Sequence, residues 1–400
     1  MFEHLQPQQA DAILSLMTAY KADSNPNKVD LGVGVYKTAQ GLTPVLDCVK
    51  VAEAQLLAEE NTKAYIGTVG SAGFNQSILK LIFGEGHPVM LENRVAAVQA
   101  PGGCGALRAG AELLNSCKAG ATIWMSSPTW ANHVPLFGNA GLEIKEYPYY
   151  DRSNKSIDFD AMMATLGGID AGDVVLIHGC CHNPCGADLS LDQWHLLTDL
   201  LIERGALPYV DLAYQGFGDG LEEDVAGLRH MARHVPEMLV ASSYSKNFGL
   251  YRERIGAIIT IAQTPQARSN SVDRLSVIGR GIWSMPPAHG ASIVETILNS
   301  DELTSQWHAE LALMRNRING LRVDVVSAIQ GAGIDQDFSF IPKEKGMFSF
   351  LGITPEQVAR LQKEFSIYIV GSSRINVAGF NENNMDYFVN ALKTVLTGSK

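Results

Sequence analysis

Residues 238–261 give the strongest indication of the fold and read MLVASSYSKNFGLYRERIGAIITI. Two apolar runs, Met238–Ala241 and Ile255–Ile261, flank a polar segment that carries Lys246. Runs that are apolar at successive positions are typical of strands buried on both faces of a parallel sheet. The polar segment follows the end of a strand, where α/β sheets usually place their functional residues.

Similar apolar runs recur earlier in the chain and alternate with helical patterns. They lie at Val95–Val98, Ala121–Met125, Val174–Ile177 and Leu207–Val210. Ser190–Gln193 fits a helix capping box and precedes apolar residues at helical spacing. The alternation predicts an α/β fold, with a large, doubly wound and mostly parallel sheet domain at residues 43–313.

The C-terminal part follows a different pattern. Residues 305–330 contain no proline and read as a long helix, and Thr354–Gln357 is a second capping box with proline at the first helical position. Short strands are expected near Met347–Phe350 and Ile367–Val370. We therefore expect a smaller α+β domain at residues 314–400, completed by the N-terminal segment, residues 1–42.

Composition excludes several classes of protein. The 400 residues carry a formal net charge of −11 and contain no run of basic residues, which disfavours nucleic-acid binding. The longest apolar stretches are far shorter than a membrane span, and the first residues lack the pattern of a signal peptide. Six cysteines without an export signal indicate reduced thiols. We expect a soluble protein of the cytoplasm that binds neither nucleic acid nor a membrane.

Lys246 stands in a segment suited to bind an aldehyde and a phosphate. A lysine amine condenses with an aldehyde only when it is unprotonated, so burial and nearby cations favour that role. Ser243 and Arg254 offer a hydroxyl and a guanidinium for a phosphate dianion. The alternative is a solvated loop lysine, which is the commoner case for a lone lysine.

The segment Ser242–Arg254 closely resembles the cofactor-lysine motif of the class I aminotransferases. These are the aspartate and aromatic amino acid branch of the pyridoxal 5′-phosphate (PLP) enzymes of fold type I. The similarity extends from Asn27 to Gly379. It implies PLP as the cofactor, bound to Lys246 as a Schiff base. It also implies a homodimer with shared active sites, in which residues 1–42 contribute to the dimer contact.

A glycine turn, Gly102–Gly105, precedes a helical pattern, and backbone N–H groups at a helix start form an anion site. The resemblance places the cofactor phosphate there. The residues that it assigns to this end of the cofactor are Gly103, Cys104, Ser243, Ser245, Arg254 and, reaching in from the other subunit, Tyr65. Cys104 stands where the family usually has threonine. Because a thiol is a weaker donor than a hydroxyl, we expect weaker phosphate binding.

The resemblance also assigns residues to the ring of the cofactor. Trp130 stacks on the pyridine ring, Asp211 pairs with the protonated ring nitrogen, and Tyr214 and Asn183 bind the phenolic oxygen. Lys246, Asp211 and Tyr214 are the expected catalytic residues. Without the surrounding motifs, Trp130 reads as plain core and Asp211 as a helix cap.

Substrate contacts are also implied by resemblance. Arg374 binds the α-carboxylate through two parallel hydrogen bonds, together with Asn183, while Gly34 and Trp130 contact the substrate. Arg280 reaches across the dimer to the distal carboxylate of a dicarboxylic substrate. An isolated surface arginine usually carries only solvated charge, so both arginine assignments depend on their surrounding motifs.

Residues 178–186 read HGCCHNPCG and admit a zinc site as an alternative. However, Cys180 and Cys181 are adjacent, and neighbours on strand-like backbone point to opposite faces. The sequence also has no CxxC spacing. We therefore expect no metal. Cys185 stands where the family usually has threonine, and we expect little effect from that difference.

These motifs predict PLP-dependent transamination of amino acids with 2-oxo acids, in ping-pong order, with Lys246 as the base that moves the α-proton. Arg280 implies that aspartate, glutamate and 2-oxoglutarate are accepted. Its neighbours Ile282, Trp283 and Met285 are more apolar than in the aspartate branch. The prediction is therefore an aromatic amino acid aminotransferase that also accepts dicarboxylates; the alternative is a strict aspartate aminotransferase. Two other classes of PLP protein are alternatives. A PLP-binding regulator would need a fused nucleic-acid-binding segment, which the net negative charge disfavours. A β-lyase would release ammonia and pyruvate, so analysis of the products separates it from a transferase.

Overall fold

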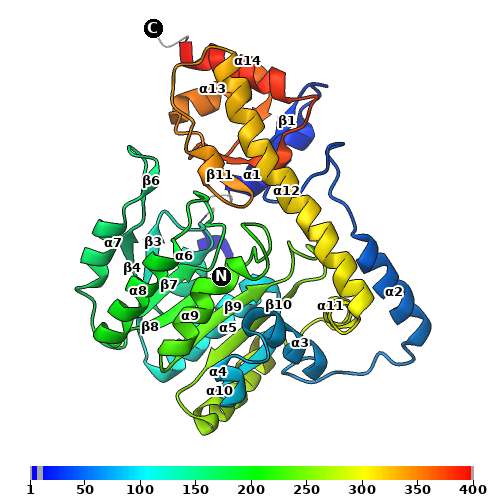
Figure 1. Cartoon of the computed structure of the whole chain (residues 1–400), viewed down its shortest axis with the longest axis vertical. Helices are drawn as coiled ribbons and strands as arrows, with labels where there is room; N and C mark the ends of the chain where they lie inside the picture. Colours follow the sequence, from blue (N-terminus) through cyan, green and yellow to red (C-terminus); the bar gives the residue numbers. More distant parts are fainter. Residues whose placement is uncertain (1, 7–11, 398–400) are drawn as a thin grey trace. The chain divides into compact units, whose positions relative to one another are not determined.

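The computed structural model describes residues 2–6 and 12–397, which form two compact units (Figure 1). The larger unit contains residues 44–316, and the smaller one contains the described residues up to 43 and from 317 to 397. The division falls within helix α12 (Asp301–Gly331). Among the described residues, no helix is both long enough and apolar enough to cross a bilayer.

The larger unit is built on a seven-stranded sheet with the strand order β2-β10-β9-β8-β7-β3-β4. Its strands are β2 (Val95–Pro101), β3 (Thr122–Ser127), β4 (Glu143–Pro148), β7 (Val174–His178), β8 (Leu207–Leu212), β9 (Met238–Ser243) and β10 (Ile255–Ile261). All neighbouring pairs are parallel except those of β10, which runs antiparallel to both β2 and β9. The predicted α/β class with a mostly parallel sheet is therefore confirmed.

Each predicted apolar run lies in one of these strands. Strand β9 is buried at every position, as a strand covered on both faces should be. Strand β4 was missed, because it lies at the edge of the sheet and is polar and largely exposed at Glu143, Lys145 and Glu146. A small hairpin pairs β5 (Tyr150–Asp151) with β6 (Ser156–Ile157).

Helices pack around this sheet. They are α2 (Asp47–Glu59), α3 (Ala72–Phe83), α4 (Pro88–Leu91), α5 (Gly102–Cys117), α6 (His133–Gly138), α7 (Phe159–Leu166), α8 (Leu191–Arg204), α9 (Ala226–His234), α10 (Pro265–Ile282) and α11 (His289–Leu298). Helix α5 packs on β2, β9 and β10, and the apolar side chains of these elements form one core. Ser190 caps α8 in the predicted capping box with Gln193, and Gly205 ends the helix in the left-handed conformation.

The smaller unit has a core of its own. Its elements are α1 (Ala12–Ala22), β1 (Val29–Asp30), β11 (Phe348–Phe350), α13 (Pro355–Phe365), β12 (Ile367–Tyr368), β13 (Arg374–Asn376) and α14 (Met385–Thr397). Strand β1 pairs in parallel with β12, which joins the N-terminal segment to the C-terminal part of the chain. The buried guanidinium of Arg322 donates to the carbonyl oxygens of Ile341, Gly346 and Phe348, and so holds the segment before β11.

Candidate active site

A cavity of about 190 Å³ lies in the larger unit, where the carboxyl ends of β8 and β9 meet the start of α5. It brings together ten of the residues predicted from the sequence: Gly103, Cys104, Trp130, Asn183, Asp211, Tyr214, Ser243, Ser245, Lys246 and Arg254. It is also lined by residues that the sequence reasoning did not assign to the site: Leu107, His178, Cys180, Ala213 and Tyr251. Chain segments far apart in sequence therefore converge on one enclosed space.

One end of the cavity is suited to bind an anion. Helix α5 begins at Gly102, whose φ of +75° is a conformation that favours glycine. A Cβ at this position would lie 2.3 Å from the Arg254 guanidinium, so the missing side chain lets that cation lie against the helix start. The Ser243 hydroxyl donates to the Ser245 hydroxyl at 3.2 Å, and Arg254 donates to Ser245 at 3.4 Å. Backbone N–H groups, hydroxyls and a guanidinium together suit a phosphate.

Lys246 follows β9 and is largely enclosed within the cavity. Burial lowers the pKa of its amine below the ordinary value, against the opposing influence of Asp211 and Cys104. Its Nζ lies 4.8 Å from the centre of the Tyr214 ring. A lysine with a lowered pKa is more often neutral at physiological pH, and the neutral amine is the form that attacks a carbonyl carbon.

Asp211 on β8 is a buried carboxylate that stays ionised. Its Oδ2 lies 3.1 Å from His133 Nε2. Burial acts to raise the pKa of Asp211, but the hydrogen bond with His133 and the electrostatic influence of the neighbouring groups hold it below its ordinary value. A negative charge kept in this position can stabilise a positive charge placed beside it inside the cavity.

A chain of hydrogen bonds connects Asp211 through His133 and Thr129 to His178, which also lines the cavity. Thr129 Oγ1 lies 2.8 Å from His133 Nδ1 and 3.1 Å from His178 Nε2. Burial lowers the pKa of His178 to about 3, so that ring is neutral. Sequence reasoning missed His133 and Thr129 as site residues. The signal was their four-residue spacing within the motif that contains Trp130.

His182 lies beside His178 and makes further contacts with buried side chains. Its ring stacks between those of Tyr149 and His178, with centroid distances of 4.3 and 3.9 Å. Its Nε2 lies 3.0 Å from Ser126 Oγ, and its Nδ1 lies 3.1 Å from Cys185 Sγ. Cys185, for which the sequence predicted little effect, is therefore in direct contact with the buried His182.

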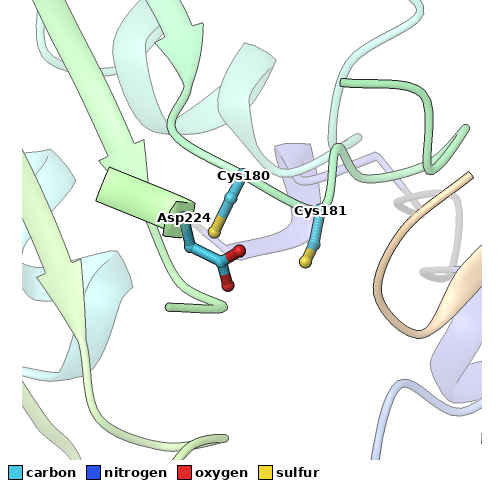
Figure 2. A group of neighbouring side chains, drawn as sticks. All are labelled: Cys180, Cys181 and Asp224. Atoms are coloured by element: carbon cyan, nitrogen blue, oxygen red, sulfur yellow. The ribbon is translucent and has the colours of Figure 1, made fainter. Parts of the chain in front are cut away.

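Cys180 and Cys181 differ from their expected geometry. The sulfur atoms of both residues and a carboxylate oxygen of Asp224 lie within 4.8 Å of one another (Figure 2). The expectation that the two cysteines point to opposite faces was wrong, because Cys181 has a φ of +52° and is not in strand conformation. Whether these three side chains can bind a metal therefore depends on their hydrogen bonds and on their protonation.

The state of these groups disfavours a metal. The Asp224 carboxylate accepts hydrogen bonds from the backbone N–H groups of Gly216, Gly218, Asp219 and Gly220, so its oxygens already hold a loop. A hydrogen bond with Cys181 and burial keep the pKa of Cys180 well above its ordinary value. A metal would require the thiolate. The absence of a metal stays a prediction.

Four predicted residues are not among those that line this cavity. Tyr65 and Arg280 belong to the larger unit and are exposed, Tyr65 to 91%. Gly34 and Arg374 belong to the smaller unit. Within that unit, Arg374 is buried, donates to Gly32 O at 2.8 Å and lies 4.3 Å from the centre of the Phe348 ring.

Comparison with known proteins identifies the family. The sequence model of the class I and II aminotransferases matches residues 26–392. The chain is 48% identical to the aspartate aminotransferase of Escherichia coli over 396 residues, which cover 99% of this chain and 100% of that protein. It is 47% identical to the aromatic-amino-acid aminotransferase of Pseudomonas aeruginosa over 385 residues, or 96% of both proteins.

The structural comparison agrees. The aromatic-amino-acid aminotransferase of Burkholderia pseudomallei, solved covalently bound to pyridoxal phosphate, superposes with a TM-score of 0.97 at 41% identity, over 99% of each chain. The cytoplasmic aspartate aminotransferase of Saccharomyces cerevisiae superposes with a TM-score of 0.98 at 32% identity, over 100% of this chain and 99% of that one. The chain belongs to the class I and II aminotransferase family.

Proposed function

We propose that this aminotransferase uses PLP to move the amino group between aromatic or dicarboxylic amino acids and 2-oxoglutarate. The observation that carries the proposal is the juxtaposition of Lys246, whose amine pKa is lowered by burial, with a phosphate-type anion site and a buried carboxylate in one cavity. Titration with PLP, followed by absorbance and by borohydride trapping at Lys246, tests this step. A chain that stays colourless and traps nothing would overturn it.

The donor groups of the cavity fit PLP at both ends. Ser243, Ser245, Arg254 and the start of α5 supply donors for a phosphate. Asp211 supplies the negative charge that a protonated pyridine nitrogen requires, and Trp130 offers a flat face beside it. When bound there, PLP supplies an electron sink that stabilises charge developing at the α-carbon of the substrate.

The protein's own groups then perform binding and proton transfer. Lys246 Nζ would hold the cofactor, and as a free amine it would take the proton from the substrate α-carbon and return it one carbon along the conjugated system. Asp211 stays ionised because His133 is hydrogen-bonded to it. Asn183 and the Tyr214 hydroxyl are assigned to the phenolic oxygen of the cofactor.

The substrate α-carboxylate is assigned to Arg374 and Asn183, with Gly34 and Trp130 in contact with the substrate. We further propose a homodimer in which Tyr65 and Arg280 enter the site of the other subunit. Both side chains are exposed in the single chain, and Ile282 beside Arg280 is exposed to 49%, which suits a surface that a second subunit covers. Arg280 would then bind the distal carboxylate of a dicarboxylic substrate.

The apolar neighbours of Arg280 favour dual specificity over strict aspartate use. Met285 accepts a hydrogen bond from the Ile66 backbone at 3.0 Å through its deformable thioether, and Ile282 and Trp283 are also apolar. Relatives of both specificities match this chain. The test is kcat/KM for aspartate, phenylalanine, tyrosine and tryptophan with 2-oxoglutarate. A kcat/KM for the aromatic substrates within tenfold of that for aspartate supports dual specificity. A kcat/KM below 1% of the aspartate value, a difference in transition-state stabilisation on the order of 3 kcal/mol, identifies a strict aspartate enzyme.

We place the enzyme in the cytoplasm. All six cysteines are free thiols, which suits a reducing compartment.

A further inference from the structure

Three histidines gather outside the cavity, on the surface of the larger unit. His195 lies on α8, and His230 and His234 lie on α9, two helices that pack side by side (Figure 1). The centroid of the His230 ring lies 3.8 Å from that of His195 and 4.3 Å from that of His234. His234 is exposed and the other two are partly exposed, so solvent reaches the cluster.

The two histidines of α9 have the spacing of a chelating pair. Residues four apart lie on one face of a helix, one turn from each other, and two histidines at this spacing are a recurrent metal-binding arrangement. His234 Nδ1 lies 2.8 Å from the backbone carbonyl oxygen of His230. A carbonyl only accepts, so Nδ1 carries a proton, and Nε2 is the nitrogen that is left to face an ion. Metal-binding histidines are commonly oriented in this way.

The surroundings of the cluster suit a cation. Asp199 lies one turn after His195 on the same face of α8 and offers a carboxylate beside the imidazole rings. Helix α9 ends at His234, and cations are stabilised at the carbonyl end of a helix.

We propose that His195, His230 and His234 form a binding site for a divalent transition ion of the zinc, nickel and copper type, with Asp199 as an oxygen ligand. Imidazole nitrogens with a carboxylate are suitable ligands for these ions. The His195 ring stacks on that of His230, and the His234 ring is tilted against it, so binding requires the rings to rotate until their nitrogens face one ion, which their surface position permits. The bound ion links α8 to α9. This site does not depend on the proposed transamination.

The test is equilibrium dialysis of the PLP-loaded, chelator-treated chain against Zn²⁺, with metal analysis. A Cys117→Ser background removes an exposed thiol, because thiolates are themselves zinc ligands. We expect one Zn²⁺ per chain, bound at least tenfold more weakly after His230→Gln or His234→Gln. His289→Gln is the matched control, because this histidine also lies near a carboxylate, 3.7 Å from Glu53, but outside the cluster.

Thermal unfolding gives a second measurement. Zn²⁺ should raise the midpoint of the parent protein and should do so much less after His195→Gln, because that change removes the ligand from α8 and with it the link between the helices. The proposal is overturned if His230→Gln and His234→Gln bind Zn²⁺ as tightly as the parent, or if His289→Gln loses as much affinity. Transaminase activity should be the same in all these variants.

Discussion

His133 Nε2 lies 3.1 Å from Asp211 Oδ2, and both side chains are buried. The two residues are 78 positions apart in the chain. This contact keeps a carboxylate ionised in a place where burial alone would favour its neutral form. It therefore links the packing of α6 to the electrostatics of the cavity.

Replacing His133 by Asn should weaken the stabilisation of the ionised Asp211 carboxylate. The pKa of Asp211 is lowered in the native protein, so losing His133 raises it and shifts the acidic limb of the activity profile to higher pH. We expect kcat/KM at pH 7.5 to fall about two- to tenfold, the loss of roughly one hydrogen bond. The measurement is kcat/KM against pH. An unchanged acidic limb would show that His133 does not act on Asp211.

Replacing Lys246 by Ala should lower kcat at least roughly a thousandfold. The reason is that no other group replaces Lys246 as the base at the substrate α-carbon. The variant should still bind PLP, but borohydride should no longer link it to the chain. Steady-state rates and mass spectrometry after reduction report the two effects. Lys50→Ala, a change of an exposed lysine, is the control. Substantial transamination by Lys246→Ala without added amines would disprove the assignment.

Replacing Arg280 by Leu should separate the two substrate classes. Losing two charge-assisted hydrogen bonds of about 1.5 kcal/mol each lowers kcat/KM for aspartate roughly a hundredfold, with less than a tenfold loss for phenylalanine. Arg274→Leu is the control, since this arginine is also exposed on α10. Equal losses on both substrates would mean that Arg280 does not bind the distal carboxylate.

Replacing Gly102 by Ala should weaken PLP binding. The new Cβ would lie 2.3 Å from Arg254, and φ is +75°. Gly84→Ala isolates the contact, because Gly84 has a φ of +77° with no atom within 4 Å of the added Cβ. Both changes strain the backbone by about 1 kcal/mol. Only Gly102→Ala should raise the Kd for PLP. A similar rise in both variants would assign the effect to strain alone.

Replacing Cys104 by Thr should tighten PLP binding. A hydroxyl donates a better hydrogen bond than a thiol, and a net gain of about 1 kcal/mol lowers the Kd roughly fivefold. Asn132 Nδ2, 3.6 Å from Cys104 Sγ, stays available as a donor to the new oxygen. Cys117→Thr, at an exposed site, is the control. If both variants bind PLP as the parent does, the Cys104 side chain does not contact the phosphate.

Most of the candidate site could be named from the sequence because its residues stand in short motifs at the ends of apolar runs. Lys246 follows the apolar run of β9, and Asp211 follows that of β8. The role of His133 was not recognised, since nothing local shows that it meets Asp211, 78 positions away. The position of the two cysteines was misjudged, because the left-handed turn at Cys181 comes from the surrounding loop.

Local features can be predicted from the amino-acid order alone: apolar runs that become strands, capping boxes at α8 and α13, and the family motif around Lys246. They depend on interactions between residues a few positions apart. The antiparallel course of β10, the ionised state of Asp211 and the stacking of His195 on His230 depend instead on the folded arrangement of the chain. Such features depend on burial and on contacts between distant segments, and both exist only after the chain has folded.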